Sequence, residues 1–431
     1  MNRVERLHQR IKENIFFIKN DFPKEKSLQV PRKLHPYMET KRNRTLKPSV
    51  VFLINSLCEG GAERVLITLS NYFVQQNYDV TILLLSKNNF YSIPKNVNVV
   101  YLSKMNDNLL GIGKLFYIPF HAWKLKQYIK NNDIETVQSS LFRANFVNII
   151  SGILGAKHNI QVVNHSVVSR FLKEGISGKI NLLLIRYLYP KADMVLHISK
   201  QMKSYFNQNF LNNKDEKVIY NPHNIESIIQ QSKEPIEKFY FDKNKRYLIT
   251  VGRLIAIKHV EDVINALSRL DSNIELIVLG QGVEESFLKQ RAKIKSVENR
   301  VHFLGQVTNP FNYMKQSDIF ISSSEIEGFP NVLIEAMICK TSVISSDCLS
   351  GPREIIAPNS NLSERLSTGM ELHQFGILYA VRDVEALVQS IKKILIDKKL
   401  KNKLEENGFV QSHRFSVQNI ANQYKSVLLR R

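Results

Sequence analysis

The feature of this sequence that most constrains its fold is a continuous apolar run at residues 50–54 that leads into a glycine pair and then a helical pattern. A strand that is apolar at every position is typical of a parallel sheet covered on both faces. After the glycine pair, apolar residues recur at helical spacing from Ala62 to Phe73, and a second apolar run follows at residues 80–85. This order predicts a βαβ unit with two parallel strands.

The same alternation continues along the chain and divides it into two series. Further strands of the first series are expected near residues 98–102, 134–138, 160–164, 194–198 and 217–220. The polar segment 230–245 is the best candidate for a linker. A second series follows it, with strands expected near residues 247–251, 274–279, 300–304, 318–322, 342–346 and 376–379. We therefore expect an α/β protein of two doubly wound, Rossmann-like domains that face each other across a cleft, where such folds bind ligands.

Charge and cysteine content limit the classes of partner and compartment. Lys and Arg number 60 against 39 Asp and Glu, which gives a net charge of +21. This charge favours nucleic acid, an anionic membrane surface or a phosphorylated substrate, unless it only serves solubility. Three cysteines without a CxxC motif cannot form a disulfide framework, which indicates a reducing, cytosolic compartment. No apolar run is long enough to predict a membrane-spanning helix.

Two loops offer groups that suit phosphate. The first, residues 59–64, places glycines at the start of a helix, where free N–H groups and the helix dipole favour an anion or a sugar hydroxyl; a tight turn explains the glycines equally well. The second follows the strand at 247–251 and carries Arg253 and Lys258, which can clamp two phosphates or simply be solvated. Neither these loops nor residues 280–282 complete a GxGxxG motif, which disfavours a nicotinamide dehydrogenase.

The most specific motif is the segment 327–335, Glu-Gly-Phe-Pro-Asn-Val-Leu-Ile-Glu. Pro330 suits the first turn of a helix, so Glu327 should precede that helix and Glu335 should lie about one turn inside it. Each carboxylate can accept two hydroxyl hydrogen bonds, so the pair is suited to bind a sugar. Two glutamates at this spacing can also occur by chance on a helix surface, but the intervening Gly-Phe-Pro-Asn argues against chance.

In this order, the motifs resemble those of GT-B fold glycosyltransferases, specifically the retaining family 4. Residues 60–64 are similar to the glycine loop of that family. Residues 252–258 are similar to its GRL-x-x-K-G element, although His259 stands where glycine is usual. Glu327 and Glu335 match its E-x7-E pair. The resemblance covers nearly all of the chain after a basic N-terminal arm.

The resemblance also implies how the chain is divided. The segments 350–354 and 376–378 are similar to a subgroup that builds bacterial surface polysaccharides such as lipopolysaccharide, and residues 414–416 resemble the start of a tail that crosses back to the first domain. The expected parts are a basic N-terminal arm at 1–48, an acceptor-binding Rossmann-like domain at 49–230, a nucleotide-sugar-binding Rossmann-like domain at 231–412, and a C-terminal crossover helix at 413–431.

By this resemblance the protein is a hexosyltransferase that takes a sugar from a nucleoside diphosphate sugar and retains its anomeric configuration. Arg253 and Lys258 would hold the diphosphate, Glu335 the ribose hydroxyls, and Glu327 would face the transferred sugar. His165 stands where the family places a histidine beside that sugar, although a lone histidine at a strand end is more often structural. These implied catalytic residues are Glu327, His165, Arg253 and Lys258.

The remaining donor contacts implied by the resemblance are Gly61 in the first domain and the backbone N–H groups of Phe329, Asn331 and Val332. UDP is the expected nucleotide because UDP sugars dominate the subgroup. The sequence contains no Asp-x-Asp motif and no His/Cys cluster with metal spacing. We therefore expect no metal and no cofactor, with cations and helix dipoles neutralising the leaving group.

Two stretches in the first domain combine aromatic residues with cations. The first includes Phe116, Phe120 and Trp123, and the second spans residues 179–189. This combination suits a membrane interface with anionic headgroups, and core helices with basic edges are the equal alternative. We expect a saccharide acceptor linked to a polyprenyl diphosphate, and a cytoplasmic protein bound peripherally to the inner face of the membrane.

Two other classes of protein compete with this interpretation. A nucleic-acid-binding protein, such as a base-modifying glycosyltransferase, would explain the charge, but the sequence has no recognition module, so we expect no nucleic-acid partner. A partner subunit that binds the donor without transferring the sugar would need fewer of the motif residues than this chain carries. The intact set of Arg253, Lys258, Glu327 and Glu335 favours an enzyme.

Overall fold

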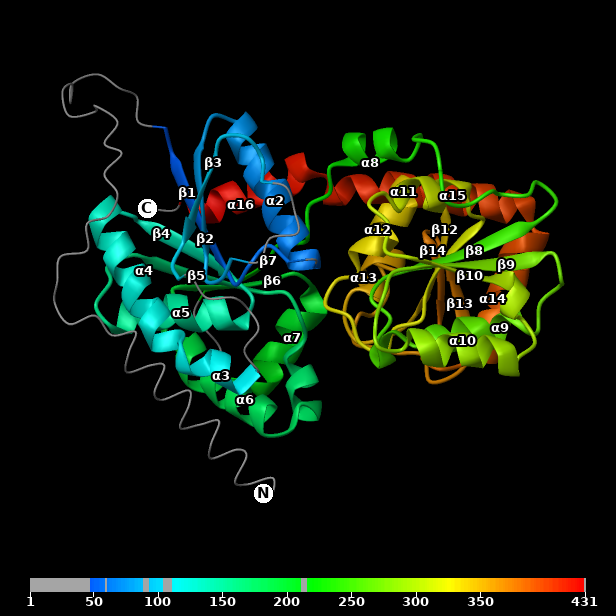
Figure 1. The fold of residues 1–431 in the computed structure, drawn as a ribbon, viewed down its shortest axis with the longest axis horizontal. Coiled ribbons are helices and arrows are strands. Elements are labelled where there is room, and N and C mark those ends of the chain that lie inside the picture. The colour runs from blue at the N-terminus through cyan, green and yellow to red at the C-terminus, as the bar shows by residue number, and fades with distance from the viewer. Residues whose placement is uncertain (1–46, 59, 88–92, 104–110, 211–214, 430–431) are drawn as a thin grey trace.

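A computed structural model describes residues 47–58, 60–87, 93–103, 111–210 and 215–429. Almost all of the predicted arm at 1–48 lies outside these described residues. The described chain forms two α/β units that lie side by side, each built around a seven-stranded sheet (Figure 1). This arrangement confirms the predicted fold class. None of the helices in the described ranges is long and apolar enough to span a membrane.

The first sheet is entirely parallel and has the order β3-β2-β1-β4-β5-β6-β7. Its strands are β1 (Ser49–Ile54), β2 (Asp79–Leu84), β3 (Val97–Tyr101), β4 (Thr136–Ser140), β5 (Asn159–Asn164), β6 (Met194–His197) and β7 (Glu216–Val218). The α-helices of this half are α2 (Gly61–Gln75), α3 (Gly111–Phe116), α4 (Ile118–Asn132), α5 (Phe142–Ile153), α6 (Gly175–Leu188) and α7 (Lys200–Asn209). The 3-10 helix η1 (Val168–Lys173) precedes α6.

The second sheet has the order β10-β9-β8-β11-β12-β14-β13, and only its edge strand β13 is antiparallel. Its strands are β8 (Arg246–Val251), β9 (Ile274–Leu279), β10 (Val301–Gly305), β11 (Ile319–Ser322), β12 (Ser342–Ser346), β13 (Met370–His373) and β14 (Gly376–Tyr379). The helices are α8 (Ile225–Gln231), α9 (Val260–Leu267), α10 (Glu285–Ile294), α11 (Phe311–Gln316), α12 (Asn331–Ile338), α13 (Pro352–Ile356), α14 (Val384–Ile396), α15 (Lys398–Ser412) and α16 (Val417–Leu428).

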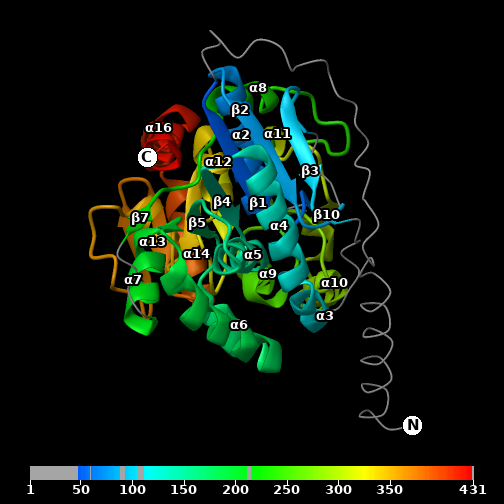
Figure 2. The same ribbon diagram turned by 90° about the vertical axis from the view of Figure 1, so that its left-hand side faces the viewer.

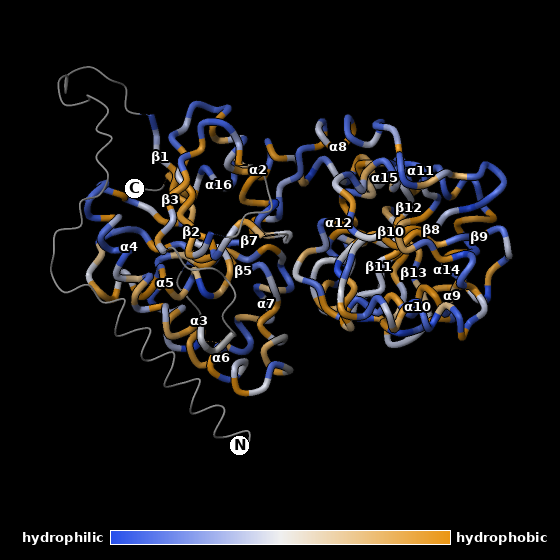
Figure 3. Tube along the Cα trace, in the orientation of Figure 1, coloured by the Kyte–Doolittle hydropathy of each residue, from blue (hydrophilic) through white to orange (hydrophobic). Residues whose placement is uncertain are grey.

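Alternate residues of the apolar strands face different cores. In β1, Phe52 and Ile54 belong to a core that α2 and α16 cover, whereas Val51 and Leu53 belong to a core beneath α4 and α5. Burial on both faces explains why these strands are apolar at every position. The hydrophobic residues accordingly gather along the strands at the centre of each unit (Figure 3).

The chain crosses between the two units a second time at its C-terminal end. His223, just after the first sheet, receives a backbone hydrogen bond from Val417 and donates one to Phe415. Beyond this bridge, α16 packs against α2 of the first unit, and the side chain of Gln161 in β5 donates to the carbonyl of Val427 at 2.7 Å. The last helix is therefore part of the first unit's core, while α15 covers the second unit (Figure 1).

Candidate active site

Arg253 lies in the loop that leaves β8, an inner strand of the second sheet, at its carboxyl end. The loop after the neighbouring strand β9 supports it, because Leu254 donates its N–H to the carbonyl of Gln281 at 2.9 Å. Gly280 has a φ of 130°, and a Cβ added to it would lie 1.9 Å from the carbonyl oxygen of Gly252. Only glycine allows this approach, so the Gly-Gln-Gly segment holds the Arg253 loop in place.

His259, which replaces the usual glycine of the family pattern, has the left-handed backbone conformation φ 46°, ψ 42°. This conformation costs an ordinary residue roughly 1–2 kcal/mol. Nδ1 of the His259 ring lies 3.1 Å from Oε1 of Glu261, and Nε2 lies 3.4 Å from Oε2 of Glu325. These contacts offset the strain, so the turn after Lys258 keeps its shape without glycine.

Lys258 and Glu327 form an ion pair at the mouth of the cleft. The Nζ atom of Lys258 lies 2.5 Å from Oε1 of Glu327, and the hydroxyl of Ser324 donates to the same oxygen at 2.6 Å. The backbone N–H of Glu327 donates to the carbonyl of Leu349 at 3.2 Å, which anchors the loop before α12. An ammonium group has three donors, so Lys258 can hold Glu327 and a phosphate oxygen at the same time.

One cavity brings several of the predicted site residues together. It lies at the carboxyl ends of β8 and β11, and Arg253, Lys258, Glu327 and Val332 are among the residues that line it. Thr250 and Ser322–Ser324 add hydroxyl groups to the same lining. The lining of the cavity thus combines two cations, one carboxylate and several hydroxyls, which are groups that bind phosphate and sugar oxygens.

Glu335 lies on α12 with only 2% of its side chain exposed, and it pairs with the other half of the molecule. Its Oε1 accepts a hydrogen bond of 2.7 Å from Nη1 of Arg64, which lies on α2. A buried carboxylate is stable only when it is paired. An ion pair therefore joins the two units across the cleft. Its carboxylate is the one that the family pattern assigns to the ribose.

The start of α12 meets the first unit directly. The Asn331 side chain accepts a hydrogen bond of 2.8 Å from the amide of Asn221, and a Cβ on Gly61 would lie 3.3 Å from the Asn331 amide nitrogen. The ring of Phe329 is buried and stacks on Tyr220 with centroids 5.1 Å apart. The side chain of Phe329 therefore belongs to the junction between the units, and the predicted donor contacts of the backbone here stay predictions.

His165 follows β5 and lies opposite the loop that carries Glu327. Its Nε2 is 3.1 Å from the hydroxyl of Ser140, and burial lowers the pKa of its ring to about 4. The ring is therefore neutral at pH 7. A Cβ on Gly328 would lie 2.5 Å from the carbonyl oxygen of His165, so glycine at 328 is what lets the two loops approach across the cleft.

Comparisons with known proteins identify the family of the chain. The family model described as Glycosyltransferase Family 4 matches residues 59–227, and the model described as Glycosyl transferases group 1 matches residues 231–411. The N-acetylgalactosamine-N,N'-diacetylbacillosaminyl-diphospho-undecaprenol 4-alpha-N-acetylgalactosaminyltransferase of Campylobacter jejuni is 30% identical over 380 residues, which are 87% of this chain and 98% of that protein. The chain is a family 4 glycosyltransferase.

Two further comparisons place this glycosyltransferase among its relatives. The GalNAc-alpha-(1->4)-GalNAc-alpha-(1->3)-diNAcBac-PP-undecaprenol alpha-1,4-N-acetyl-D-galactosaminyltransferase of Campylobacter jejuni is 25% identical over 384 residues, which are 88% of this chain and 98% of that protein. The crystal structure of Anabaena HepE in complex with UDP has a TM-score of 0.68 and 22% identity over 88% of this chain and 99% of that chain. The likeness to HepE shows that the fold is GT-B.

Two charged residues of the glycosyltransferase's glycine loop were not predicted as site residues. Glu63 is buried; burial raises its pKa, and its own backbone N–H and the charge of Arg253 act in the opposite direction. Arg64 reaches Glu335, as described above. Both lie in the first turn of α2 directly after the glycine pair. The sequence did indicate two charged residues at the start of a helix that faces the cleft. It could not indicate their partners, because these are far away in the sequence.

A second contact between the domains comes from the motif at residues 350–354. The two carboxylate oxygens of Glu354 accept hydrogen bonds of 2.8 Å from the backbone N–H groups of Lys200 and Gln201, at the start of α7. The hydroxyl of Tyr220 donates to the same carboxylate at 3.0 Å. The first N–H groups of a helix lack partners within the helix and favour a negative charge. Glu354 thus caps a helix of the opposite domain.

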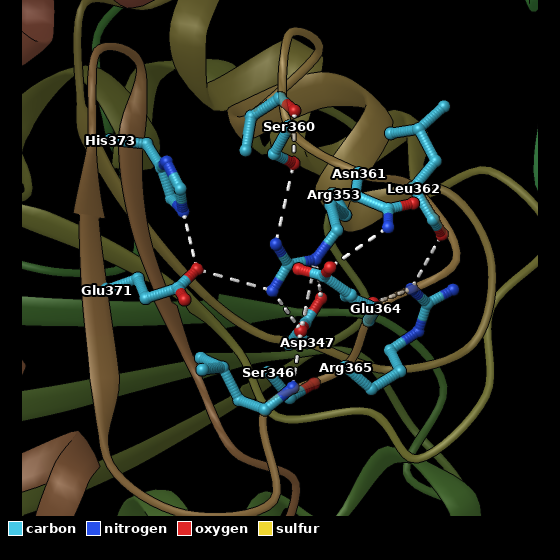
Figure 4. A network of polar contacts seen from close by, with 12 residues as sticks. Ser346, Asp347, Arg353, Ser360, Asn361, Leu362, Glu364, Arg365, Glu371 and His373 are labelled. Atoms are coloured by element: carbon cyan, nitrogen blue, oxygen red, sulfur yellow. Dashed lines mark hydrogen bonds and ion pairs between the residues drawn. The ribbon is translucent and has the colours of Figure 1, made fainter.

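Arg353, the neighbour of Glu354, is buried in a network within the second domain (Figure 4). Its guanidinium binds Asp347 with Nε–Oδ1 and Nη2–Oδ2 distances of 3.0 and 2.5 Å, and it lies 3.3 Å from Glu371 on β13. His373 contacts Glu371 at 3.0 Å. This network ties the end of β12 to the edge hairpin. Within the described ranges, no three His, Cys, Asp or Glu side chains gather in a way that could hold a metal ion.

Proposed function

We propose that this glycosyltransferase moves a sugar from a UDP-linked donor to a saccharide linked to a polyprenyl diphosphate, with retention of the anomeric configuration and without a metal ion. The observation that carries the proposal is that Arg253, Lys258 and Glu327 line the same cavity, next to the helix that bears Glu335. The two cations match the diphosphate of a nucleotide sugar, and the two carboxylates match the hydroxyl groups of its sugar rings.

Each part of the donor has a matching group in this arrangement. Arg253 and Lys258 bind the diphosphate, Arg253 through parallel N–H groups and Lys258 as a point charge. Glu327 accepts hydrogen bonds from hydroxyls of the transferred sugar, and Lys258 fixes the orientation of its carboxylate. The neutral ring of His165 can form a hydrogen bond with the sugar but adds no charge at pH 7. The cations neutralise the leaving group in the role that a metal fills in other enzymes.

The transfer itself needs no nucleophile from the protein. The bond between the anomeric carbon and the diphosphate oxygen breaks, which leaves positive charge on the sugar ring and negative charge on the phosphate. The acceptor hydroxyl then attacks the same face of the anomeric carbon and gives its proton to the departing phosphate oxygen. Retaining hydrolases use a carboxylate nucleophile close to an acid, whereas here Glu327 is engaged by Lys258 and Ser324.

The acceptor assignment is supported by relatives and by the surface of the first domain. The two Campylobacter relatives are named for acceptors that carry diphospho-undecaprenol or PP-undecaprenol. In this chain, α3 and α6 lie at the same end of the first domain (Figures 1 and 2). Their apolar side chains are exposed, among them Phe116 (66%), Ile176 (73%), Leu183 (56%) and Tyr187 (64%).

The same end of the domain also carries positive charge. Lys179 and Arg186 are exposed on α6 beside these apolar residues, and both line a groove with Leu172 and Leu183. Exposed apolar side chains mixed with cations suit the surface of an anionic bilayer. This end of the domain, defined by α3 and α6, is the proposed membrane face. It would place the cleft where a lipid-linked acceptor can enter.

The assay that tests the proposal offers labelled UDP and GDP sugars together with bacterial lipid-linked saccharides, and follows label into the organic phase. We expect transfer from one UDP sugar in the presence of EDTA, and a loss of at least 100-fold for Lys258→Ala, as for other preorganised charges on a leaving group. Arg269→Ala is the matched control, because Arg269 pairs with Glu385 at the surface, away from the cavity. Transfer that requires a divalent ion, or a wild-type rate in Lys258→Ala, would overturn the proposal.

A further inference from the structure

A polar cluster at the junction of the domains contains more groups than the family motifs account for. It joins Arg64 on α2 and Glu335 on α12 by the ion pair of 2.7 Å, and Asn221 and Asn331 by the hydrogen bond of 2.8 Å. His223 lies close enough for the charges of Glu335 and Arg64 to act on its pKa in opposite directions. Three separate segments of the chain, 61–64, 221–223 and 331–335, therefore meet at one place.

Several polar atoms of this cluster are buried and unpaired. Oε2 of Glu335, Nε2 of His223 and Oδ1 of Asn221 have no hydrogen-bond partner among the described residues. The three residues are 2%, 5% and 2% exposed. A buried polar atom without a partner is costly, and in native proteins such atoms commonly face a ligand or water. Two oxygen acceptors and a ring nitrogen are the groups that a pair of hydroxyls would satisfy.

The two oxygens of Glu335 therefore have different tasks. Oε1 is held by Arg64, which fixes the carboxylate in one orientation and keeps a countercharge beside it. Burial lowers the pKa of His223 to about 4, so its ring is neutral at pH 7 and brings no second cation to the carboxylate. Oε2 is buried and has no partner among the described residues, so it is the oxygen of this carboxylate that is left to accept a hydrogen bond from a ligand.

We propose that Arg64 is a positioning residue of the donor site, which holds Oε1 of Glu335 so that Oε2 binds a ribose hydroxyl of the donor. The inference rests on the proposed function, since it assigns the ribose of the nucleotide to this cluster. Its consequence is that the ribose site is complete only when α2 lies against α12. Nucleotide binding and closure of the two domains are then coupled, because one side chain belongs to both.

The experiment compares the dissociation constants of UDP and 2',3'-dideoxy-UDP by calorimetry, on the full-length protein. In the wild type, removing the hydroxyls should weaken binding by about tenfold or more, as for hydrogen bonds to a charged group. In Arg64→Ala the same ratio should fall below about threefold, because the carboxylate is no longer oriented. A merely structural role of Arg64 would weaken both nucleotides equally and leave the ratio unchanged.

Three variants separate the possible outcomes. Arg64→Lys keeps the charge and should restore part of the ratio, and it replaces Arg64→Ala if that variant does not fold. Glu335→Gln should lower the ratio by itself and add nothing to Arg64→Ala. Arg269→Ala should leave the ratio at its wild-type value. A wild-type ratio in Arg64→Ala and Arg64→Lys, or tighter UDP binding in both, overturns the positioning role.

Failure of the proposed function has a different signature. If the wild type binds neither UDP nor GDP, the donor assignment itself is wrong, and this is seen before any variant is compared. If GDP binds and UDP does not, the same ratio is measured with GDP and its dideoxy analogue. A ratio that falls in Arg64→Ala then supports the positioning role of Arg64, and an unchanged ratio contradicts it.

Discussion

The two glutamates of the segment 327–335 have different surroundings, which indicates different roles. Oε1 of Glu327 lies at the cavity and is shared by Lys258 and Ser324, whereas Glu335 is almost wholly buried and paired with Arg64. The ribose does not change charge during the reaction, but the sugar ring does. A contact to the ribose should therefore matter for affinity, and a contact to the sugar should matter for turnover.

Replacing each glutamate by alanine is expected to separate these effects. Glu335→Ala should weaken binding of the donor nucleotide by about tenfold or more, because it removes a charged hydrogen-bond acceptor. Glu327→Ala should lower kcat by about 100-fold and change donor affinity by less than about threefold. Calorimetry and initial rates measure the two quantities. Equal affinity of the wild type and Glu335→Ala for the nucleotide would refute the ribose assignment.

His223 should make the stability of the protein depend on pH. Its folded-state pKa is about 4 because it is buried, against about 6.5 in an unfolded chain. The unfolded state therefore binds more protons between these values. The contribution of neutral His223 to the free energy of unfolding is fully present above pH 6.5. It is lost as the pH falls toward 4, and the loss amounts to up to about 3 kcal/mol.

The measurement for His223 is urea denaturation of the wild type and His223→Gln at pH 8 and pH 5. The variant cannot take up this proton, so its free energy of unfolding should fall less between the two pH values. Comparing the change with pH cancels any loss of packing that the substitution causes at both values. An equal fall in both proteins would show that His223 is protonated in the native state at pH 5.

At the scale of residues, the sequence predicted the groups of one domain better than those that act between domains. Arg253, Lys258, Glu327 and Val332 were predicted from local motifs, and they line one cavity. Arg64 and Glu354 were missed because their partners lie 271 and 153–154 positions away in the chain. A local pattern shows that a charged residue lies in a loop or at a helix end, but it does not indicate which distant residue that side chain will contact.

At the scale of elements, the apolar pattern predicted the parallel strands most clearly where nearly every residue is buried, as in β1, β2 and β9. The strand β13 was not predicted, because Met370–His373 is only four residues long and none of them is buried at the sheet edge. The helix α15 was also missed, because only a narrow stripe of it is buried, including Leu404, Gly408 and Gln411. Elements that bury little of their surface leave a weak sequence signal.

The helix α7 offers a prediction at this scale, because its N-terminus is capped by Ser199 of its own domain and also by Glu354 of the other domain. Glu354→Gln keeps the size of the side chain but removes the charge and one acceptor. We expect the amide hydrogens of Lys200 and Gln201 to exchange about tenfold faster, since a charged hydrogen bond to a helix start contributes on the order of 1–2 kcal/mol. Hydrogen-exchange mass spectrometry of the peptide around residue 200 measures this rate.

The control for α7 is a capping change within one domain. Asp383 caps α14 by accepting the N–H of Ala386 at 2.9 Å. Asp383→Asn should speed exchange at the start of α14 and leave α7 unchanged. If Glu354→Gln has no effect on α7, the carboxylate does not cap that helix in solution, and the two domains are then held together mainly by the other contacts between them.

At the scale of the whole molecule, the arrangement of surfaces predicts where the protein binds. The proposed membrane face formed by α3 and α6 should bind vesicles that contain anionic lipid at low salt. Lys179→Glu combined with Arg186→Glu should reduce this binding at least tenfold, since each cation near an anionic bilayer contributes about 1 kcal/mol. Sedimentation with anionic and neutral vesicles measures the effect.

The matched control reverses two charges on the second domain. Lys392→Glu with Lys399→Glu changes the net charge equally, and both residues are exposed on α14 and α15. This variant should bind vesicles nearly as well as the wild type. Equal losses in the two double variants would show that net charge alone drives the binding, and no difference between anionic and neutral vesicles would remove its electrostatic basis.

The position of α16 also affects how the chain folds while it is being made. The strands of the first sheet end at Val218, but the helix that completes their core begins only at Val417. At a synthesis rate of 5–20 residues per second, roughly 10–40 s pass between the synthesis of the last strand and that of this helix. Until then the apolar face of α2 that α16 covers is open to water, and Tyr424, which is fully buried in the finished protein, has not yet been made. A growing chain therefore carries an unfinished first domain through the synthesis of the whole second one. Fragments that end before α16 should therefore aggregate, because the apolar face of α2 that this helix covers stays exposed.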